Sequence, residues 1–301
     1  MSRAALALAV AGLAAAALAG TCGPASAQVL GAPPTYSDRS LSAVPNAAAM
    51  TTLIWSPGLD DGFVPQGLTF MDGAVLVAAY RSEDPKQGRG PCRIYRLDPR
   101  SGAITGTLDL PPSCGHAGGL ARGRPGRLWV ADTRDIFEIA LDRAGGARIG
   151  RVIGSIRLTG GLKGSFAAST ADALWLGTYS GEPGARLYGL PFDKLAAGPG
   201  AIGEQDATAA VALPVKAQGA AFDAAGRLWI TRSGSTFGEL LQLDPRDGAV
   251  LKRFAMPAGI EDIGFDPQGG LWAVGEAGSK RWLGWATYFP VVFRLEPALL
   301  R

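Results

Sequence analysis

The sequence predicts an all-β fold, a single-domain β-propeller of five four-stranded blades. Three observations predict it: a repeated apolar motif, a repeat length near fifty residues, and no segment of ten or more residues with a helical period. The motif reads GRLWVA at 126–131, DALWLG at 172–177, GRLWIT at 226–231 and GGLWAV at 269–274, with a weaker copy, GAVLVA, at 73–78. Its anchors, Leu76, Trp129, Trp175, Trp229 and Trp272, are 53, 46, 54 and 43 residues apart.

Each unit also carries the other strands of a blade. A short apolar stretch precedes every anchor, as in QGLTF and EDIGF, and an alternating stretch follows it, as in IYRLDP and VFRLEP. Runs of this kind bounded by Gly and Pro are strands, and four strands per unit make a propeller blade. The Trp and Leu anchors are therefore predicted as blade core. A sixth blade, which would need one more anchor, is kept as an alternative.

The two ends of the repeat region are predicted to meet. The last unit stops after its third strand, and TTLIW at 51–55 is an orphan strand at the other end. This strand can supply the missing outer strand, which closes the ring and removes an exposed sheet edge.

The N-terminus has the pattern of a secretory signal. One basic residue precedes an alanine-rich apolar run, and ASAQ supplies small residues for cleavage after Ala27. Residues 1–27 are therefore predicted as a cleaved signal peptide, 28–48 as a flexible leader and 49–301 as the propeller domain. A lipoprotein anchored at Cys22 is the less favoured alternative. The protein is expected to be secreted or periplasmic.

Composition disfavours two classes of partner. The formal net charge is +3 and no long basic run occurs, which disfavours nucleic acid. No apolar stretch after Gln28 is long enough to cross a bilayer, so no membrane span is predicted. We expect a monomer that binds a small-molecule, carbohydrate or protein ligand.

The stretch CGHAGGLA at 114–121 holds the single histidine of the chain, His116, and one of its three cysteines. Cys92 opens the third strand of the first blade and Cys114 follows its fourth strand, so both fall on the face where the inner strands begin, here called the top face. A Cys92–Cys114 disulfide is predicted in an oxidising compartment, worth about 3 kcal/mol for a loop of roughly 20 residues. His116 is either a structural corner or a general acid or base at the mouth of the axis.

Polar residues gather where the inner strands begin and the second strands end. Convergent polar groups around a concave axis are typical of a ligand site. Two long loops, 81–91 and 276–290, should flank one another on this face, and the aromatic side chains of the second loop either plug the axis or form a ligand platform. The predicted ligand-binding residues are Gln66, Tyr80, Arg81, Lys163, Tyr179, Gln218, Arg232, Trp282 and Trp285.

The phrases QGAAFDAAGRLWITRSG and EDIGFDPQGGLWAVGE resemble the repeats of the SMP-30/gluconolactonase, NHL and streptogramin-lyase propellers, over most of 62–297. The resemblance to the lactonase-like members implies a divalent metal at the top of the axis, with Asp132 and Glu261 in suitable places. The resemblance to streptogramin lyases implies a functional glutamate at Glu276. Asn46 is the one asparagine of the chain, so the ligands here would be carboxylates without an asparagine.

Two functions follow from these residues. The first is an exported propeller that binds a ligand on its top face. The alternative is a metal-assisted hydrolase, lactonase or lyase, in which His116 acts as general acid or base and Ca²⁺ or Mg²⁺ binds to oxygen ligands. The predicted metal ligands are Asp132, Glu261, Asp262 and Glu276. A serine hydrolase is disfavoured because no GxSxG motif is present.

Overall fold

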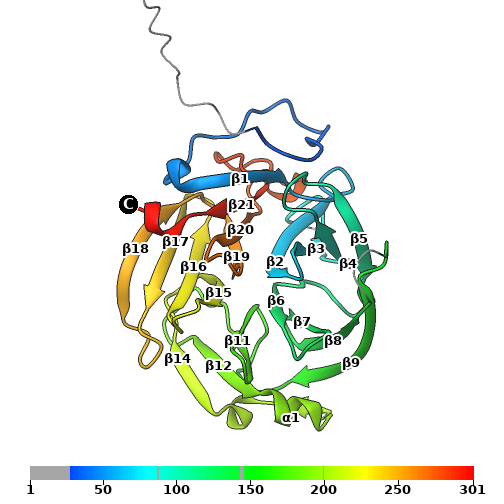
Figure 1. Cartoon of the computed structure of the whole chain (residues 1–301), viewed down its shortest axis with the longest axis vertical. Coiled ribbons are helices and arrows are strands. Elements are labelled where there is room, and N and C mark those ends of the chain that lie inside the picture. The colour runs from blue at the N-terminus through cyan, green and yellow to red at the C-terminus, as the bar shows by residue number, and fades with distance from the viewer. Residues whose placement is uncertain (1–27, 87, 143–145, 199) are drawn as a thin grey trace, which may run out of the picture.

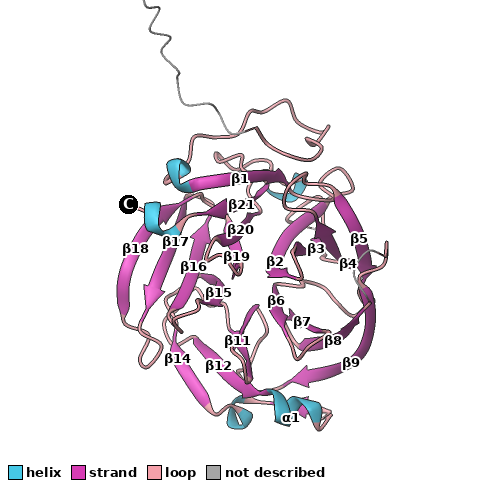
Figure 2. Cartoon of the chain, in the orientation of Figure 1, coloured by secondary structure: helices cyan, strands magenta, loops and turns pink. Residues whose placement is uncertain are grey.

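The computed structural model describes residues 28–301 except 87, 143–145 and 199, so the predicted signal peptide lies outside the described residues. Five antiparallel sheets surround a central axis, with β2, β6, β15 and β19 nearest the centre (Figure 1). Strands dominate the chain and its helices are short (Figure 2). The prediction of a five-bladed β-propeller is confirmed, and the described residues contain no sixth blade.

The first two blades follow one another along the chain, from axis to rim. Blade 1 consists of β2 (Phe63–Met71), β3 (Ala74–Arg81), β4 (Cys92–Leu97) and β5 (Ile104–Asp109). Blade 2 consists of β6 (Gly119–Arg122), β7 (Arg127–Asp132), β8 (Asp135–Leu141) and β9 (Gly150–Leu158). The short strand β13 (Ala201–Ile202) adds to the rim of blade 2 in parallel with β9.

Blades 3 to 5 repeat the pattern. Blade 3 consists of β10 (Phe166–Ser169), β11 (Ala173–Gly177), β12 (Arg186–Pro191) and β14 (Ala209–Ala212), and a short helix, α1 (Phe192–Ala196), follows β12. Blade 4 consists of β15 (Ala217–Phe222), β16 (Leu228–Gly234), β17 (Phe237–Leu243) and β18 (Val250–Met256). Blade 5 takes β19 (Ile260–Phe265), β20 (Leu271–Gly275) and β21 (Val291–Leu295) from the C-terminal end of the chain.

The outer strand of blade 5 comes from the other end of the chain. β1 (Met50–Trp55) pairs antiparallel with β21, from Met50 opposite Leu295 to Trp55 opposite Val291. This confirms that the segment 51–55 closes the ring. β21 therefore has neighbours on both sides, so the edge left by a three-stranded blade is covered.

The tryptophan anchors pack between neighbouring blades. Trp272 in blade 5 stacks on Phe70 at the end of β2, with ring centroids 6.0 Å apart. Trp229 in blade 4 meets Phe265 at the end of β19 edge to face, at 6.1 Å. Each ring thus covers the aromatic residue that ends the next inner strand, which confirms the anchors as blade core. Such pairs add about 0.5–1.5 kcal/mol beyond burial.

Two of these anchors are each hydrogen-bonded to an aspartate in the turn that precedes their strand. The Asp223 carboxylate accepts hydrogen bonds from the Trp229 indole at 3.0 Å and from the Arg227 side chain at 2.6 Å. The Asp266 carboxylate accepts from the Trp272 indole at 3.1 Å in the same way. The phrases FDAAGRLW and FDPQGGLW therefore encode a turn and a core contact together.

Residues 28–48 run first along β1, where Leu30 forms an isolated bridge with Ile54, then along the loop 276–290, and they end in a short 3-10 helix, η1 (Ala47–Ala49). The Tyr36 hydroxyl donates to the carbonyl of Gly278 at 2.7 Å, and Ser42 exchanges hydrogen bonds with the backbone of Tyr288. The Arg39 guanidinium donates to three carbonyls between residues 283 and 286. These contacts define the path of the segment, whereas its mobility as a leader stays a prediction. Among the described residues, no helix is long and apolar enough to span a membrane.

Candidate functional site

A chain of hydrogen-bonded polar side chains crosses the top face. We call Gln66, His116, Gln218, Glu261 and Glu276 the top arc. Gln66, Gln218 and Glu261 lie near the starts of the inner strands β2, β15 and β19. His116 precedes β6, and Glu276 follows β20 directly. The propeller topology therefore brings together side chains that are far apart in sequence, and all five are among the residues predicted from strand positions.

The arc is continuous over four blades. The Nε2 atom of His116 lies 2.8 Å from Gln66 Oε1, and Gln66 Nε2 donates to Glu276 Oε2 at 2.9 Å. Glu276 and Glu261 are hydrogen-bonded to each other. Gln218 Nε2 completes the arc by donating to Glu261 Oε1 at 3.0 Å. Blade 3 contributes no side chain to these hydrogen bonds.

The two glutamates form a buried pair that shares a proton. Glu261 is 3% exposed and Glu276 is 6% exposed, which makes a second negative charge costly here. Burial raises the pKa of Glu276 to about 7. Burial and the neighbouring Glu276 carboxylate raise the pKa of Glu261 well above its usual value. At neutral pH Glu261 is therefore the protonated partner, and the pair carries about one negative charge or less.

The arc also fixes the tautomer of His116. Gln66 presents its amide nitrogen to Glu276, so its oxygen faces His116 and must accept a proton from Nε2. Nδ1 then carries a lone pair, and it is buried without a hydrogen-bond partner among the described residues. Burial, assisted by the charge of Arg89, lowers the pKa of His116 to about 3. The imidazole is therefore neutral at physiological pH, and its Nδ1 atom can accept a hydrogen bond.

The loop 276–290 covers one end of the arc. The Trp282 indole donates to Glu276 Oε2 at 2.6 Å, and its ring stacks on Trp285 with centroids 4.8 Å apart. Arg281 donates to Ser82 Oγ and to two carbonyls of the loop 81–91. The prediction that these two loops flank one another is therefore confirmed.

Tyr80 lies between the arc and these loops. It is 1% exposed, and its ring centroid is 5.8 Å from that of His116. The guanidinium groups of Arg89 and Arg281 lie over the same ring at 5.3 and 5.8 Å. The sequence places Arg281 beside the aromatic platform of the loop 276–290, whereas Arg89 was not among the predicted site residues, although it lies in the loop 81–91 that the sequence singled out. A loop has no periodicity that could place Arg89 beforehand.

The other two predicted metal ligands, Asp132 and Asp262, hold backbone amides. Asp132 accepts hydrogen bonds from the amides of residues 115–117, at 2.6 Å for His116. Asp262 is fully buried and accepts from the amides of Leu68 and Leu120, at 3.0 and 3.2 Å. Burial raises the pKa of Asp262 well above its usual value. These two carboxylates tie inner strands and loops of different blades together.

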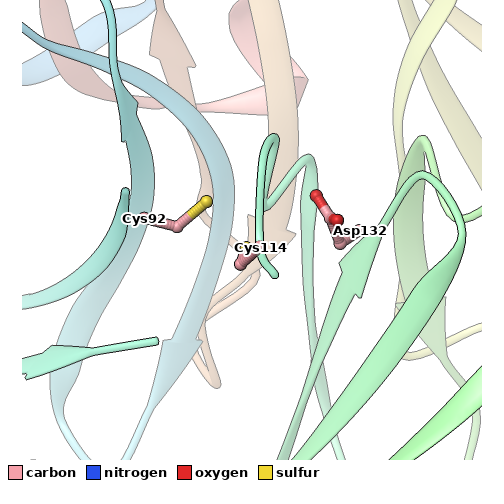
Figure 3. Close-up of side chains that lie close together, drawn as sticks. All are labelled: Cys92, Cys114 and Asp132. Carbon is pink, nitrogen blue, oxygen red and sulfur yellow. The ribbon is translucent and has the colours of Figure 1, made fainter. Parts of the chain in front are cut away.

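The two cysteines lie side by side, as their strand positions predicted. Cys92 and Cys114 are free buried thiols, and Figure 3 shows Cys114 between Cys92 and Asp132. One ligand atom from each of the three residues lies within 4.8 Å of the others, and within the described chain no other group of three or more His, Cys, Asp or Glu does so. A hydrogen bond to Cys114, followed by burial, raises the pKa of Cys92. The disulfide stays a prediction that this placement permits.

Four predicted ligand-binding residues lie apart from the arc. Arg232 pairs with Glu239 at 3.2 Å, and Arg81 pairs with Glu83 at 3.7 Å. The other two, the half-buried Lys163 and the exposed Tyr179, belong to blade 3. Blade 3 is the blade that contributes no side chain to the arc. None of the four predicted residues forms a hydrogen bond or ion pair with the arc within the part of the chain that the structure describes.

Comparisons with known proteins place the chain by its fold. Neither a protein-family model nor a curated protein matches it, so the resemblance to SMP-30 and NHL repeats gains no support from a family. The glutaminyl cyclase of Myxococcus xanthus is similar, with a TM-score of 0.54 and 15% identity over 85% of this chain and 95% of that one. The PQQ-bound aldose sugar dehydrogenase of Streptomyces coelicolor has a TM-score of 0.50 and 17% identity over 77% and 94%. The chain is thus a β-propeller whose solved neighbours include enzymes.

Proposed function

We propose that this chain binds, at the top arc, a small molecule rich in hydrogen-bond donors. The observation that supports this is the excess of acceptors. His116 Nδ1 is a buried acceptor without a partner among the described residues, and the carboxyl groups of Glu276 and Glu261 lie further along the same arc. The Gln66 amide nitrogen is already used by Glu276 and by the carbonyl of Pro65. A molecule that enters the arc must therefore supply donors, as a sugar hydroxyl or an amine does.

The aromatic loop supports a ligand with a flat apolar face. Trp282 is fixed by its hydrogen bond to Glu276, and Trp285 stacks on it. A rigid pair of rings beside polar groups provides apolar contact area next to hydrogen bonds. A carbohydrate or an aromatic amine meets both requirements.

A second candidate is acid–base catalysis at the same place. A carboxyl group with a pKa of about 7 beside a protonated partner is poised to exchange protons near neutral pH. In this alternative Glu276 acts as the base, Glu261 as the acid and His116 as a neutral acceptor in a hydrolase or lyase. The solved neighbours named above support only the shared fold.

The sequence-based form of this alternative included a divalent metal held by the four predicted carboxylates. Glu261 and Glu276 would have to lose their shared proton to hold Ca²⁺ or Mg²⁺. Asp132 and Asp262 are each engaged by backbone amides, and neither joins the glutamate pair in a group of close ligand atoms among the described residues. The four carboxylates therefore do not fit one metal site, and no step of the alternative uses a metal.

We also propose that the chain acts outside the cytoplasm. The composition of residues 1–27 supports this, because it combines a basic start, a short apolar run and a small-residue cleavage site. An oxidising compartment would also suit a bond between Cys92 and Cys114.

Calorimetry with neutral sugars, amino sugars and primary amines tests the binding proposal. We expect at least one of these classes to bind, and the variants Gln66→Ala and Glu276→Gln to weaken that binding about tenfold or more. Asp247→Asn is the matched control, because Asp247 caps a turn at Ala249, between β17 and β18. Assays with lactones on the same proteins test the catalytic alternative.

Two results would count against the proposal. One is that no compound of the three classes binds to the folded wild type. The other is that a compound binds equally well to the wild type and to both arc variants. Lactone turnover that Glu276→Gln abolishes would instead favour the catalytic alternative.

A further inference from the structure

A cavity opens at the opposite end of the axis from the top arc. Its volume is about 850 Å³, within the range of small-molecule sites. The far ends of all five inner strands line it, with residues such as Thr69, Leu120, Ala168, Ala221 and Gly264. We call it the bottom cavity.

The walls of the bottom cavity are mainly small and apolar. Ala121, Ala167 and Ala220 line the cavity from three different blades. The larger side chains of Trp229 and Ile263 also line it. Small side chains at this level leave the space that larger ones would fill. Such a wall favours a compact hydrocarbon group.

The carboxylates that line the cavity are already neutralised. Asp223 accepts from Arg227 and Trp229, with two further hydrogen bonds from turn amides. Asp266 accepts from Arg294 at 2.7 Å, from Trp272 and from two turn amides. Because each carboxylate is already paired with an arginine, neither is expected to attract a cationic ligand.

Arg122 is the cation of the lining without an ion pair among the described residues, although the charges of Asp72 and Asp266 act on it from outside ion-pair distance. Its Nε donates to the carbonyl of Phe70 and its Nη2 to the carbonyl of Phe265, both at 2.8 Å. These two carbonyls belong to blades 1 and 5, so the guanidinium of blade 2 is held from two sides. Arg122 forms no ion pair, and its Nη1 no hydrogen bond, with any of the described residues. An arginine fixed in this way is preorganised for an anion.

The bottom cavity is separate from the top arc. On β19, Glu261 belongs to the arc and Ile263 lines the cavity, and Asp262 lies between them. Asp262 is fully buried and holds the amides of Leu68 and Leu120, which are inner-strand residues at the same level. A ligand in the cavity therefore does not reach the arc directly.

We propose that the bottom cavity is a second binding site, for a small organic monocarboxylate whose carboxylate pairs with Arg122. The hydrocarbon part of this ligand lies against the alanine walls, and the single positive charge matches a single negative one. This proposal is independent of the function proposed for the top arc, because no residue of the arc lines the bottom cavity.

An NMR titration with hexanoate tests the proposal, with hexanamide as its neutral counterpart. We expect saturable shifts of the Arg122 Nε–H and Trp229 indole signals with hexanoate, and at least tenfold weaker binding of hexanamide. Arg122→Gln should weaken hexanoate binding about tenfold or more, whereas Arg122→Lys should retain part of it.

Arg124→Gln is the matched control, because Arg124 is two residues away and pairs with Asp193 outside the cavity. Hexanoate binding should be unchanged in this variant. Three results would overturn the proposal: no saturable binding to the wild type, equal affinity for hexanoate and hexanamide, or equal affinity of wild type and Arg122→Gln. Amide spectra of each variant establish that it is folded.

Discussion

The protonation of His116 gives the sharpest test of the geometry of the top arc. The perturbation is a decrease in pH from 7 to 4. In an unfolded chain a histidine titrates near pH 6.5, whereas burial lowers the pKa of His116 in the folded state to about 3. At this residue the folded protein therefore binds fewer protons than the unfolded chain over this range, and the contribution of His116 to stability falls as the pH falls.

The size of the effect follows from the two pKa values. Between pH 7 and pH 4 the unfolded chain gains about 3 kcal/mol by protonating this histidine, and the folded chain gains almost nothing. Glu276 acts in the opposite direction. Its folded pKa of about 7 lies above the usual value of 4.5, so its contribution to stability is present at low pH and is lost as the pH rises through 4.5–7. The net pH dependence of the wild type is therefore not diagnostic.

The variant His116→Gln separates the two effects. Glutamine still offers a donor to Gln66, so the hydrogen bond from Gln66 to Glu276 is kept in both proteins and the contribution of Glu276 cancels to first order in the difference. Chemical denaturation at several pH values should show the variant gaining about 3 kcal/mol relative to the wild type between pH 7 and pH 4. A difference that stays constant with pH would refute the assigned environment of His116.

The same residue can be observed directly, because it is the single histidine of the chain. Its ring nitrogens should show the neutral form with the proton on Nε2 from pH 8 to pH 4. A midpoint near 6.5, or a proton on Nδ1, would refute the hydrogen-bond assignment through Gln66.

The remaining predictions concern the pair, the core and the thiols. Glu261→Gln should leave the pKa of Glu276 near 7, because glutamine is neutral and donates a hydrogen bond as protonated Glu261 does, whereas Glu261→Ala should raise that pKa by removing the donor; infrared titration of the carboxyl band measures both, and a lowered midpoint in Glu261→Gln would contradict the protonated state of Glu261. Trp229→Ala should cost about 3–5 kcal/mol in urea denaturation, and a loss below 1 kcal/mol would argue against its role between blades 4 and 5. Oxidation during folding should join Cys92 to Cys114 and add about 3 kcal/mol of stability over Cys114→Ser, whereas a folded protein with two free thiols by mass spectrometry after oxidative refolding would exclude the bond.

The fold could be predicted because its repeat is periodic. The tryptophan anchors recur at nearly equal steps, and each lies in the second strand of a blade. The orphan strand at 51–55 was predictable as the closing strand, because the last unit lacked one. The inserted helix α1 and strand β13 were not predicted, because they belong to a loop without a repeat.

The candidate site was predictable to the extent that strand position determines height along the axis. Gln66, Gln218 and Glu261 occupy matching places on three inner strands, and the structure joins them through Glu276. Strand position does not determine which way a long side chain turns. Arg232 lies within β16 at the right height, but its side chain pairs with Glu239 directly opposite on β17.

The measurement that tests the central claim most directly is the nitrogen chemical shift of His116 Nδ1 during titration with the strongest binder among the sugars, amino sugars and amines. The account predicts that this resonance moves toward the hydrogen-bonded position as the ligand saturates, because Nδ1 is the buried acceptor that the ligand must satisfy. A ligand that saturates the protein and leaves the Nδ1 resonance unmoved would contradict the claim that the top arc is the binding site.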